Sequence, residues 1–224
     1  MSKPLRVGVG QRHNLRLEGG DDSFRYSVAL QYNGISGVMK GSQRDTFNGG
    51  ITLSYHHHNI LFTNDLSIGH TKSDESPYGS FSDYTRLNPY WSPYDENGNV
   101  VKMFDDDIDF FGGFSNLPAN PLYNATLNQK NSSQYTDITN NFSIEWRPIE
   151  GLITRGRVGV TWQSSESDYY LPAKHTMFEA DEYKTDEGAL RKGRYDYGTG
   201  KLTNYEIALT ASYSKLFAEK HLLY

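Results

Sequence analysis

The sequence predicts an all-β protein whose strands follow one another as a single antiparallel, up-and-down meander. Three observations predict this fold. Apolar and polar residues alternate with a period of two in seven segments, 17 tyrosines and 11 phenylalanines match the composition of strands, and tight turns alternate with long connections along the chain. We therefore expect seven strands, with 221–224 beginning an eighth.

Each expected strand has one apolar and one polar face. In the clearest example Phe24, Tyr26 and Val28 alternate with Arg25, Ser27 and further polar residues. The same alternation predicts the full set of seven strands at 14–18, 24–33, 47–55, 62–68, 137–146, 155–163 and 205–214.

The connections between these strands alternate strictly in length. Tight turns are expected at 19–22, 56–59, 147–151 and 217–220, and long connections at 34–44, 72–134 and 166–201. This pattern is typical of a transmembrane β-barrel, whose periplasmic turns are short and whose external loops are long. Strands of about ten residues also match the length that crosses an outer membrane at a tilt.

The two faces then acquire distinct environments. We expect the apolar face to meet lipid on the convex side and the charged face to line a watery lumen. Aromatic residues stand at both ends of the apolar face, as in the girdles of such barrels: Tyr32, Phe47, Trp162 and Tyr205 at the outer end, and Phe24, Tyr55, Trp146 and Tyr213 at the inner end. Asn64 and Asn140 fall on the apolar face, where each needs a neighbour to satisfy its hydrogen bonds.

Composition and motifs exclude several functional classes. The chain has no cysteine, so disulfides and thiolate metal sites are excluded, and no apolar run reaches the length of a membrane-spanning helix. A formal charge of -5 without a basic run argues against nucleic acid as a partner. No G-x-S-x-G, H-E-x-x-H or dinucleotide-binding pattern occurs, so we expect no enzymatic activity, no catalytic residue and no cofactor.

Three polar clusters could be mistaken for metal sites. The run His56 to His58 fits a solvated turn better than a metal site, because neighbouring strand residues point to opposite faces. The segment 95–99 lacks the calcium-loop pattern, and its Asn-Gly pair predicts a type I′ hairpin tip. The acidic cluster at 105–109 fits a solvated loop apex better than a cation or substrate site, so no metal is expected.

Aromatic residues in the two longest connections are the candidate ligand-binding residues. Aromatic rings stack on sugars and on peptides, but a loop of this length also needs a small core of its own. Both roles stay open for the five candidates, which are Tyr90, Trp91, Tyr94, Tyr169 and Tyr170.

Several stretches together resemble the SusC/RagA family of TonB-dependent outer-membrane transporters. RHNLRLEGG at 12–20 and FRYSVALQYNGISGVMK at 24–40 resemble the early barrel. They are followed in the family's order by PYDENGN at 93–99, NPLYNATL at 120–127 and NNFSIEWRPIEGL at 140–152. The resemblance implies an integral β-barrel of the cell outer membrane with 22 strands, of which residues 1–224 would be a part without the plug domain, signal peptide or TonB box.

The resemblance also implies a function and partners for the intact protein. Such a transporter imports oligosaccharides, peptides or similar large nutrients, with a SusD-like surface lipoprotein as lid and TonB as the energy source, while outer-membrane lipid surrounds the barrel. The loop aromatics could equally contact the SusD-like lid. The alternative from another class is a soluble, secreted β-sandwich that binds carbohydrate through loop aromatics.

Overall fold

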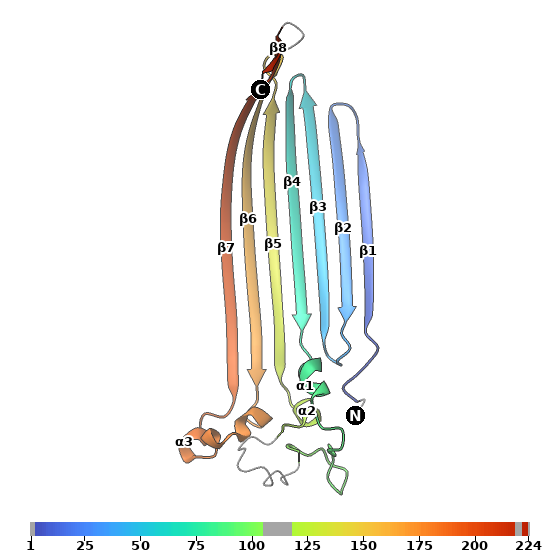
Figure 1. Ribbon diagram of the computed structural model, residues 1–224, viewed down its shortest axis with the longest axis vertical. Helices are drawn as coiled ribbons and strands as arrows, with labels where there is room; N and C mark the ends of the chain where they lie inside the picture. The colour runs from blue at the N-terminus through green and yellow to red at the C-terminus, as the bar shows by residue number, and fades with distance from the viewer. Residues whose placement is uncertain (1–2, 105–117, 218–220, 224) are drawn as a thin grey trace.

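The strands form one antiparallel sheet in chain order. The computed structural model describes residues 3–104, 118–217 and 221–223. Seven strands pair in the order β1 to β7, which confirms the expected meander (Figure 1). They are β1 (Val9–Gly20), β2 (Phe24–Ser36), β3 (Gln43–His57), β4 (Ile60–Asp74), β5 (Lys130–Trp146), β6 (Leu152–Leu171) and β7 (Arg194–Tyr213).

Two further short strands lie apart from this sheet. β8 (Lys215–Phe217) pairs with β9 (His221–Leu223) in a separate two-stranded ladder. The expectation that 221–224 begins an eighth strand of the meander is therefore wrong. The described part of this segment, 221–223, pairs with β8 and not with β7.

The register confirms that the alternating residues share faces. Residues paired directly across an antiparallel sheet point to the same side. Val28 pairs with Leu17 on one side and Ile51 on the other, Ile51 pairs with Leu66, and Val158 pairs with Phe142 and Ile207. We call this side of the sheet the apolar face. The other side, here the polar face, carries the charged residues Arg25, Asp65, Asp137, Glu145, Arg155, Arg157 and Glu206.

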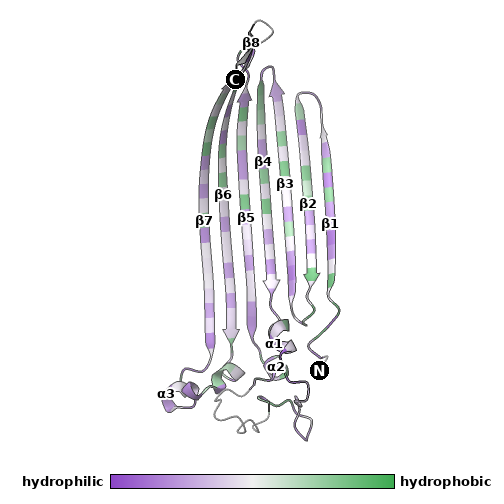
Figure 2. Cartoon of the chain, in the orientation of Figure 1, coloured by the Kyte–Doolittle hydropathy of each residue, from purple (hydrophilic) through white to green (hydrophobic). Residues whose placement is uncertain are grey.

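Several strands extend further than the sequence predicts, and the connections are correspondingly shorter. The long connections lie at 75–129 and 172–193, and the expected long loop at 34–44 shrinks to 37–42. The added strand residues are mainly polar on both faces, so periodicity gives no signal for them, yet their backbones continue the ladder. At about 3.3 Å per residue a 20-residue strand such as β6 spans about 66 Å, twice the ~30 Å of a bilayer core. Figure 2 shows that the loop-side part of β5 to β7 is mainly hydrophilic.

The sheet has no hydrophobic core of its own. Among the residues that the structure describes, the buried apolar side chains lie before β1, in connections or at a strand end, and they are Pro4, Met39, Phe104, Leu171 and Phe178. On the apolar face many of the large side chains stay exposed, up to 82% for Leu209 on β7. No second sheet of comparable size covers this face within the described ranges, which argues against the sandwich alternative.

The two asparagines on the apolar face satisfy each other. Asn64 Nδ2 donates to Asn140 Oδ1 at 3.0 Å, and Asn140 Nδ2 donates to Asn64 Oδ1 at 3.2 Å. The expected need for a neighbouring acceptor is therefore met inside the sheet. On the polar face several charges are paired: Glu145 accepts from Arg155 Nε at 2.7 Å and from Arg147 Nε at 2.8 Å, and Arg157 pairs with Glu206.

Tight turns close the hairpins at the end opposite the long loops (Figure 1). In the turn between β5 and β6, Gly151 has φ +84°, which favours glycine. A methyl group on its Cα would lie 2.1 Å from the Ser214 carbonyl oxygen, so the position also has no room for a side chain.

In the described residues the helices are few and short, as befits an all-β fold, and they lie in the two long connections. They are α1 (Phe81–Thr85), α2 (Pro121–Asn124), the 3₁₀ helices η2 (Thr176–Glu179) and η3 (Asp181–Tyr183), and α3 (Asp186–Ala189). Of the helices in the described part of the chain, none is long and apolar enough to cross a membrane.

Candidate functional site

The two long connections, 75–129 and 172–193, meet at one end of the sheet (Figure 1). We call their described residues the loop cap. The helices α1, α2, η2 and α3 each begin with a side-chain cap, whereas η3 follows Ala180 without one. Ser80 Oγ accepts from Asp83 N at 3.1 Å, Asn120 Oδ1 from Leu122 N at 3.0 Å, and Thr185 Oγ1 from Gly188 N at 3.0 Å. The caps satisfy backbone groups that such short helices cannot satisfy internally.

Asn120 is the central polar residue of the first connection. It is fully buried, and its Nδ2 donates to Val101 O at 2.6 Å and to Pro93 O at 3.1 Å. With its cap bond to α2, the side chain ties the 93–101 segment to the helix. Pro121 follows at the first helical position, where its missing N–H costs nothing.

A second asparagine joins the two connections. Asn124 Nδ2 donates to Thr176 Oγ1 at 2.7 Å, and the Thr176 backbone N donates to Asn124 Oδ1 at 3.2 Å. Lys102 and Glu179 form an ion pair beside this contact. Phe178 anchors the second connection, being 2% exposed with its ring edge against Tyr183 at 5.1 Å.

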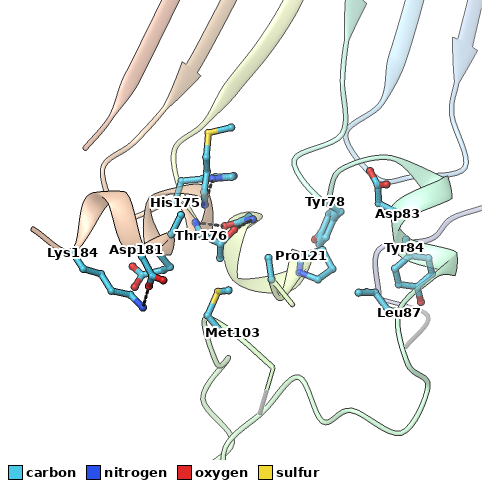
Figure 3. Close-up of a pocket in the computed structure, with 15 residues that line it drawn as sticks. Tyr78, Asp83, Tyr84, Leu87, Met103, Pro121, His175, Thr176, Asp181 and Lys184 are labelled. Atoms are coloured by element: carbon cyan, nitrogen blue, oxygen red, sulfur yellow. Dashed lines mark hydrogen bonds and ion pairs between the residues drawn. The ribbon is translucent and has the colours of Figure 1, made fainter. Parts of the chain in front are cut away.

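Between the two connections lies a cavity of about 690 Å³, which we call the cap cavity. Figure 3 shows Tyr84 and Leu87 on one side of it and His175 and Asp181 on the other. Its lining mixes aromatic, aliphatic and charged groups: Tyr78, Asp83, Tyr84, Leu87, Met103, Ala119, Pro121, Asn124, His175, Thr176, Met177, Glu179, Ala180, Asp181 and Lys184. Its size and mixed lining suit an organic ligand with both apolar and polar groups.

His175 is the titratable residue of the cavity whose environment is most distinctive. Its Nδ1 accepts from Met177 N at 3.1 Å and so caps η2. Burial lowers the pKa of His175 below its usual 6.5, and the nearby Lys102 charge lowers that pKa further. The imidazole is therefore neutral at pH 7, which its role as an acceptor requires.

Three of the five candidate aromatics lie in the first connection, in different surroundings. The Tyr90 side chain is 93% exposed and projects into solvent. Trp91 stacks on the buried Phe104 ring at 5.2 Å, and Tyr94 accepts a hydrogen bond from Lys3, whose Nζ also lies 4.7 Å from its ring centre. Trp91 thus packs within the loop cap and Tyr94 contacts Lys3 of the N-terminal segment, whereas the Tyr90 side chain is available to a ligand.

Tyr169 and Tyr170 are on strand β6 and not in a loop. The expected loop at 166–201 is wrong at this point, because 166–171 continues the ladder with β7. The Arg194 guanidinium lies 5.6 Å from the Tyr169 ring, and Tyr170 meets Tyr195 edge to face at 6.4 Å. The structure therefore does not bring the five aromatics together at one place.

The polar clusters considered as metal sites in the sequence have separate outcomes. Within the described ranges no group of three His, Cys, Asp or Glu residues is placed to hold a metal ion. The 95–99 segment forms the expected hairpin tip, with Asp95 Oδ1 accepting from Asn97 N and Asn99 N. The predicted type I′ turn is wrong, because Gly98 has φ +83° but Asn97 does not have positive φ. The acidic cluster at 105–109 lies outside the described residues.

The cap residues Asn120, Asn124, His175 and Thr176 were not predicted as site residues. A signal existed for the first of them, since Asn followed by Pro is a helix N-cap pattern. The Asn124 and Thr176 contact joins residues 52 apart in the chain and leaves no local pattern.

Comparison with known proteins gives matches among solved structures alone. No family model and no curated protein matches the sequence. One solved structure of the RagAB peptide transporter superposes with a TM-score of 0.69 at 16% identity, over 95% of this chain and 23% of that chain. Structures of the RagAB peptide importer in "closed-closed" and "open-open" states each superpose with a TM-score of 0.66 at 18% identity over 94% of this chain. The chain spans less than a quarter of those proteins and shares their fold over that part.

Proposed function

We propose that the chain is part of a TonB-dependent outer-membrane transporter of the SusC/RagA type, contributing barrel wall and external loops. The observation that carries this proposal is the combination of one uncovered apolar face, one charged face and a single end that holds both long connections. The likeness to solved RagAB structures over 95% of the chain supports it. We assign the chain no catalytic residue in this role.

Outer-membrane lipid would cover the apolar face. An apolar surface that runs across seven strands is unfavourable in water, and the exposed side chains are those that lipid accepts. The polar face would line the lumen, where hydrated pairs such as Arg155 with Glu145 cost little. The polar strand ends of β5 to β7 would rise above the membrane and carry the loop cap.

The remaining wall would come from chain outside residues 1–224. Among the described strands, β1 and β7 each pair on one side only, so both leave a row of backbone groups for further strands. In the intact transporter we expect a SusD-like lipoprotein over the loop cap, and TonB on the periplasmic side.

The ligand would be a peptide, an oligosaccharide or a similar large nutrient held at the loop cap. The cap cavity offers space of about 690 Å³, and the exposed Tyr90 offers a stacking surface. Likeness to a peptide transporter supports a peptide ligand, while stacking aromatics suit sugars equally. Trp91, Tyr94, Tyr169 and Tyr170 stay proposed contacts, with a packing role as the competing explanation.

Dependence on amphiphile tests the membrane placement. We expect the 224-residue chain to need micelles or vesicles to reach its β-structure, because its apolar face has no cover in water. Circular dichroism and sedimentation with and without a nonionic detergent measure this. A folded monomer in plain buffer would contradict the proposal.

Substitution in the intact transporter tests the ligand site. Tyr90→Ala should weaken binding of a defined peptide or oligosaccharide mixture about three- to tenfold without disturbing the cap, since one stacking ring is worth about 0.5–1.5 kcal/mol. Trp91→Ala with Tyr94→Ala should instead raise hydrogen exchange across the cap. Unchanged affinity in all folded variants would remove these aromatics as ligand contacts.

A further inference from the structure

A hollow of about 460 Å³ lies on the polar face near the loop-side ends of β4 to β7, and we call it the Tyr135 hollow. The polar-face side chains that line it are hydroxylated, namely Thr71, Ser73, Ser133, Tyr135, Ser165 and Ser167. Tyr135 is the one large side chain among them and is 39% exposed. Glu166 also borders the hollow, but it alternates with the two serines of β6, so its carboxylate points to the opposite face, where Gln134 binds it.

The Asp137 carboxylate lies beside this hollow on the same face of the sheet. Asp137 follows Tyr135 by two residues on β5 and pairs with Gly69 on β4. A methyl group on Gly69 would lie 2.5 Å from Asp137 Oδ1, so the carboxylate extends across the sheet over Gly69. Its oxygens reach solvent, and within the part of the chain that the structure describes no donor contacts them. Asp137 therefore offers an accessible acceptor without a partner of its own.

The surroundings of Asp137 on the polar face are neutral. The nearest charged residues on β3, β4 and β7 are Arg44, Asp65 and Glu206, each four residues along its strand from the row that contains Asp137. Four residues span about 13 Å, and Arg44 Nε is held in its own row by the Ser73 hydroxyl at 3.0 Å. The charged residues of β2, β5 and β6 on this face are further along their strands, and those of β1 are four strands or about 19 Å away. The carboxylate is thus an isolated negative charge.

An accessible carboxylate beside an exposed tyrosine suits a basic side chain. A guanidinium or ammonium group donates charge-assisted hydrogen bonds to a carboxylate, and the face of a tyrosine ring attracts the same cation. Asp137 and Tyr135 are about 7 Å apart along one strand, so one basic side chain can meet both.

The long connections that surround the entrance also favour a cation. By sequence, 75–129 and 172–193 contain 13 Asp or Glu residues and six Lys or Arg residues, which gives a formal charge of -7. A field of this sign raises the local concentration of basic ligands at the loop-side end of the sheet.

We propose that the Tyr135 hollow and Asp137 form a second binding site, which holds an arginine or lysine side chain of a transported peptide. This inference rests on the proposed function, in which the polar face lines the lumen. The basic group pairs with the Asp137 carboxylate and lies against the Tyr135 ring, while the hydroxyls of the hollow exchange hydrogen bonds with the peptide backbone. The site makes the transporter selective for basic peptides over neutral ones.

The polar face offers a matched control for Asp137. Asp65 is a carboxylate on the same face and accepts from Thr52 Oγ1 at 2.7 Å. Asp65→Asn therefore removes the same charge as Asp137→Asn, but about 13 Å from the site. Gly69→Ala tests the geometry, because it keeps every charge but places a methyl group where the Asp137 carboxylate lies.

Isothermal titration calorimetry of the intact transporter in nonionic micelles measures the selectivity. The probes are two alanine-based hexapeptides with blocked ends, one with a single arginine and one with citrulline, which is neutral and similar in shape. We expect the unsubstituted transporter and Asp65→Asn to prefer the arginine peptide about tenfold. Asp137→Asn and Gly69→Ala should each lose most of this preference and keep their affinity for the citrulline peptide. Circular dichroism identifies folded variants, and either of the two suffices if the other does not fold.

The other outcomes would overturn the site. They are equal binding of the two peptides by the unsubstituted transporter, an unchanged preference in folded Asp137→Asn, and an equal loss in Asp65→Asn, which would assign the selectivity to the overall charge of the wall. Failure of the proposed function is distinguishable. A folded monomer in plain buffer, or a transporter that binds neither peptide, would contradict peptide transport and this inference together, whereas equal binding of both peptides would contradict this inference alone.

Discussion

The asparagine pair on the apolar face offers the sharpest test of how the sheet is solvated. Asn64 and Asn140 are each other's hydrogen-bond partners, through two bonds of 3.0 and 3.2 Å, on a face that otherwise carries mainly apolar side chains. We consider three variants, namely Asn64→Leu, Asn140→Leu and the double substitution. The two single variants leave one amide without its partner, whereas the double variant leaves none.

The structure sets the expected magnitudes. A buried amide that loses its partner costs about 1–3 kcal/mol. Each single variant should therefore lower the free energy of unfolding by about 1–2 kcal/mol, because the lost bonds outweigh the added apolar contact. In the double variant two leucines meet lipid or detergent with no polar group left, so stability should return to that of the unsubstituted chain or exceed it. The coupling energy should be at least about 1 kcal/mol, within the range for polar pairs in membranes.

Urea unfolding in micelles, followed by tryptophan fluorescence, supplies the four free energies of the double-mutant cycle. The control is Thr139 and Thr161, whose hydroxyls lie 3.1 Å apart on the polar face. Water can replace that bond, so the valine cycle there should couple by less than about 0.5 kcal/mol. Equal coupling on the two faces, or a double asparagine variant as unstable as the sum of the singles, would refute the assignment of one face to an apolar solvent.

Three further outcomes follow from the turns and the loop cap. Gly151→Ala should lower the free energy of unfolding, measured in urea, by about 2–4 kcal/mol, because the position has positive φ and no space for a methyl group. Gly98→Ala also has positive φ but has free space, so it should lower that free energy by about 1 kcal/mol. Equal losses in the two variants would contradict this reasoning. The lowered pKa of His175 means that protonation of the imidazole destabilises the folded loop cap. The protection of the Met177 amide against hydrogen exchange should therefore fall as the pH drops below about 6.5, and His175→Gln should remove this pH dependence. Asn124→Ala should destabilise the junction of the two connections by about 1–3 kcal/mol, seen as faster exchange in 172–193 with β1 to β4 unaffected.

The strands and their order could be predicted because their signal is local. Phe24, Tyr26 and Val28 alternate with polar neighbours, and each tight turn forces the next strand to lie alongside. The strand ends could not be predicted in the same way. In 163–170 both faces are polar, so no period distinguishes strand from loop, and only the pairing with β5 and β7 extends β6 to Leu171.

The candidate site was less accessible to sequence reasoning. The sequence offers five aromatic residues as candidates, but it cannot tell that Trp91 stacks on Phe104 while Tyr90 stays in solvent. The cap cavity depends on contacts between two connections, such as Asn124 with Thr176. Such contacts follow from tertiary packing, for which a single sequence carries no pattern.

The uneven spacing of the strands along the chain has a consequence for the order of assembly. Most neighbouring strands are joined by a few residues, but β4 and β5 are separated by 75–129. Closing that loop costs about 2 kcal/mol more in chain entropy than closing 37–42, since the cost grows with the logarithm of length. We therefore expect β1 to β4 and β5 to β7 to form as two separate blocks. The ladder between β4 and β5 would then be the last to close, and the loop cap would become ordered in the same step.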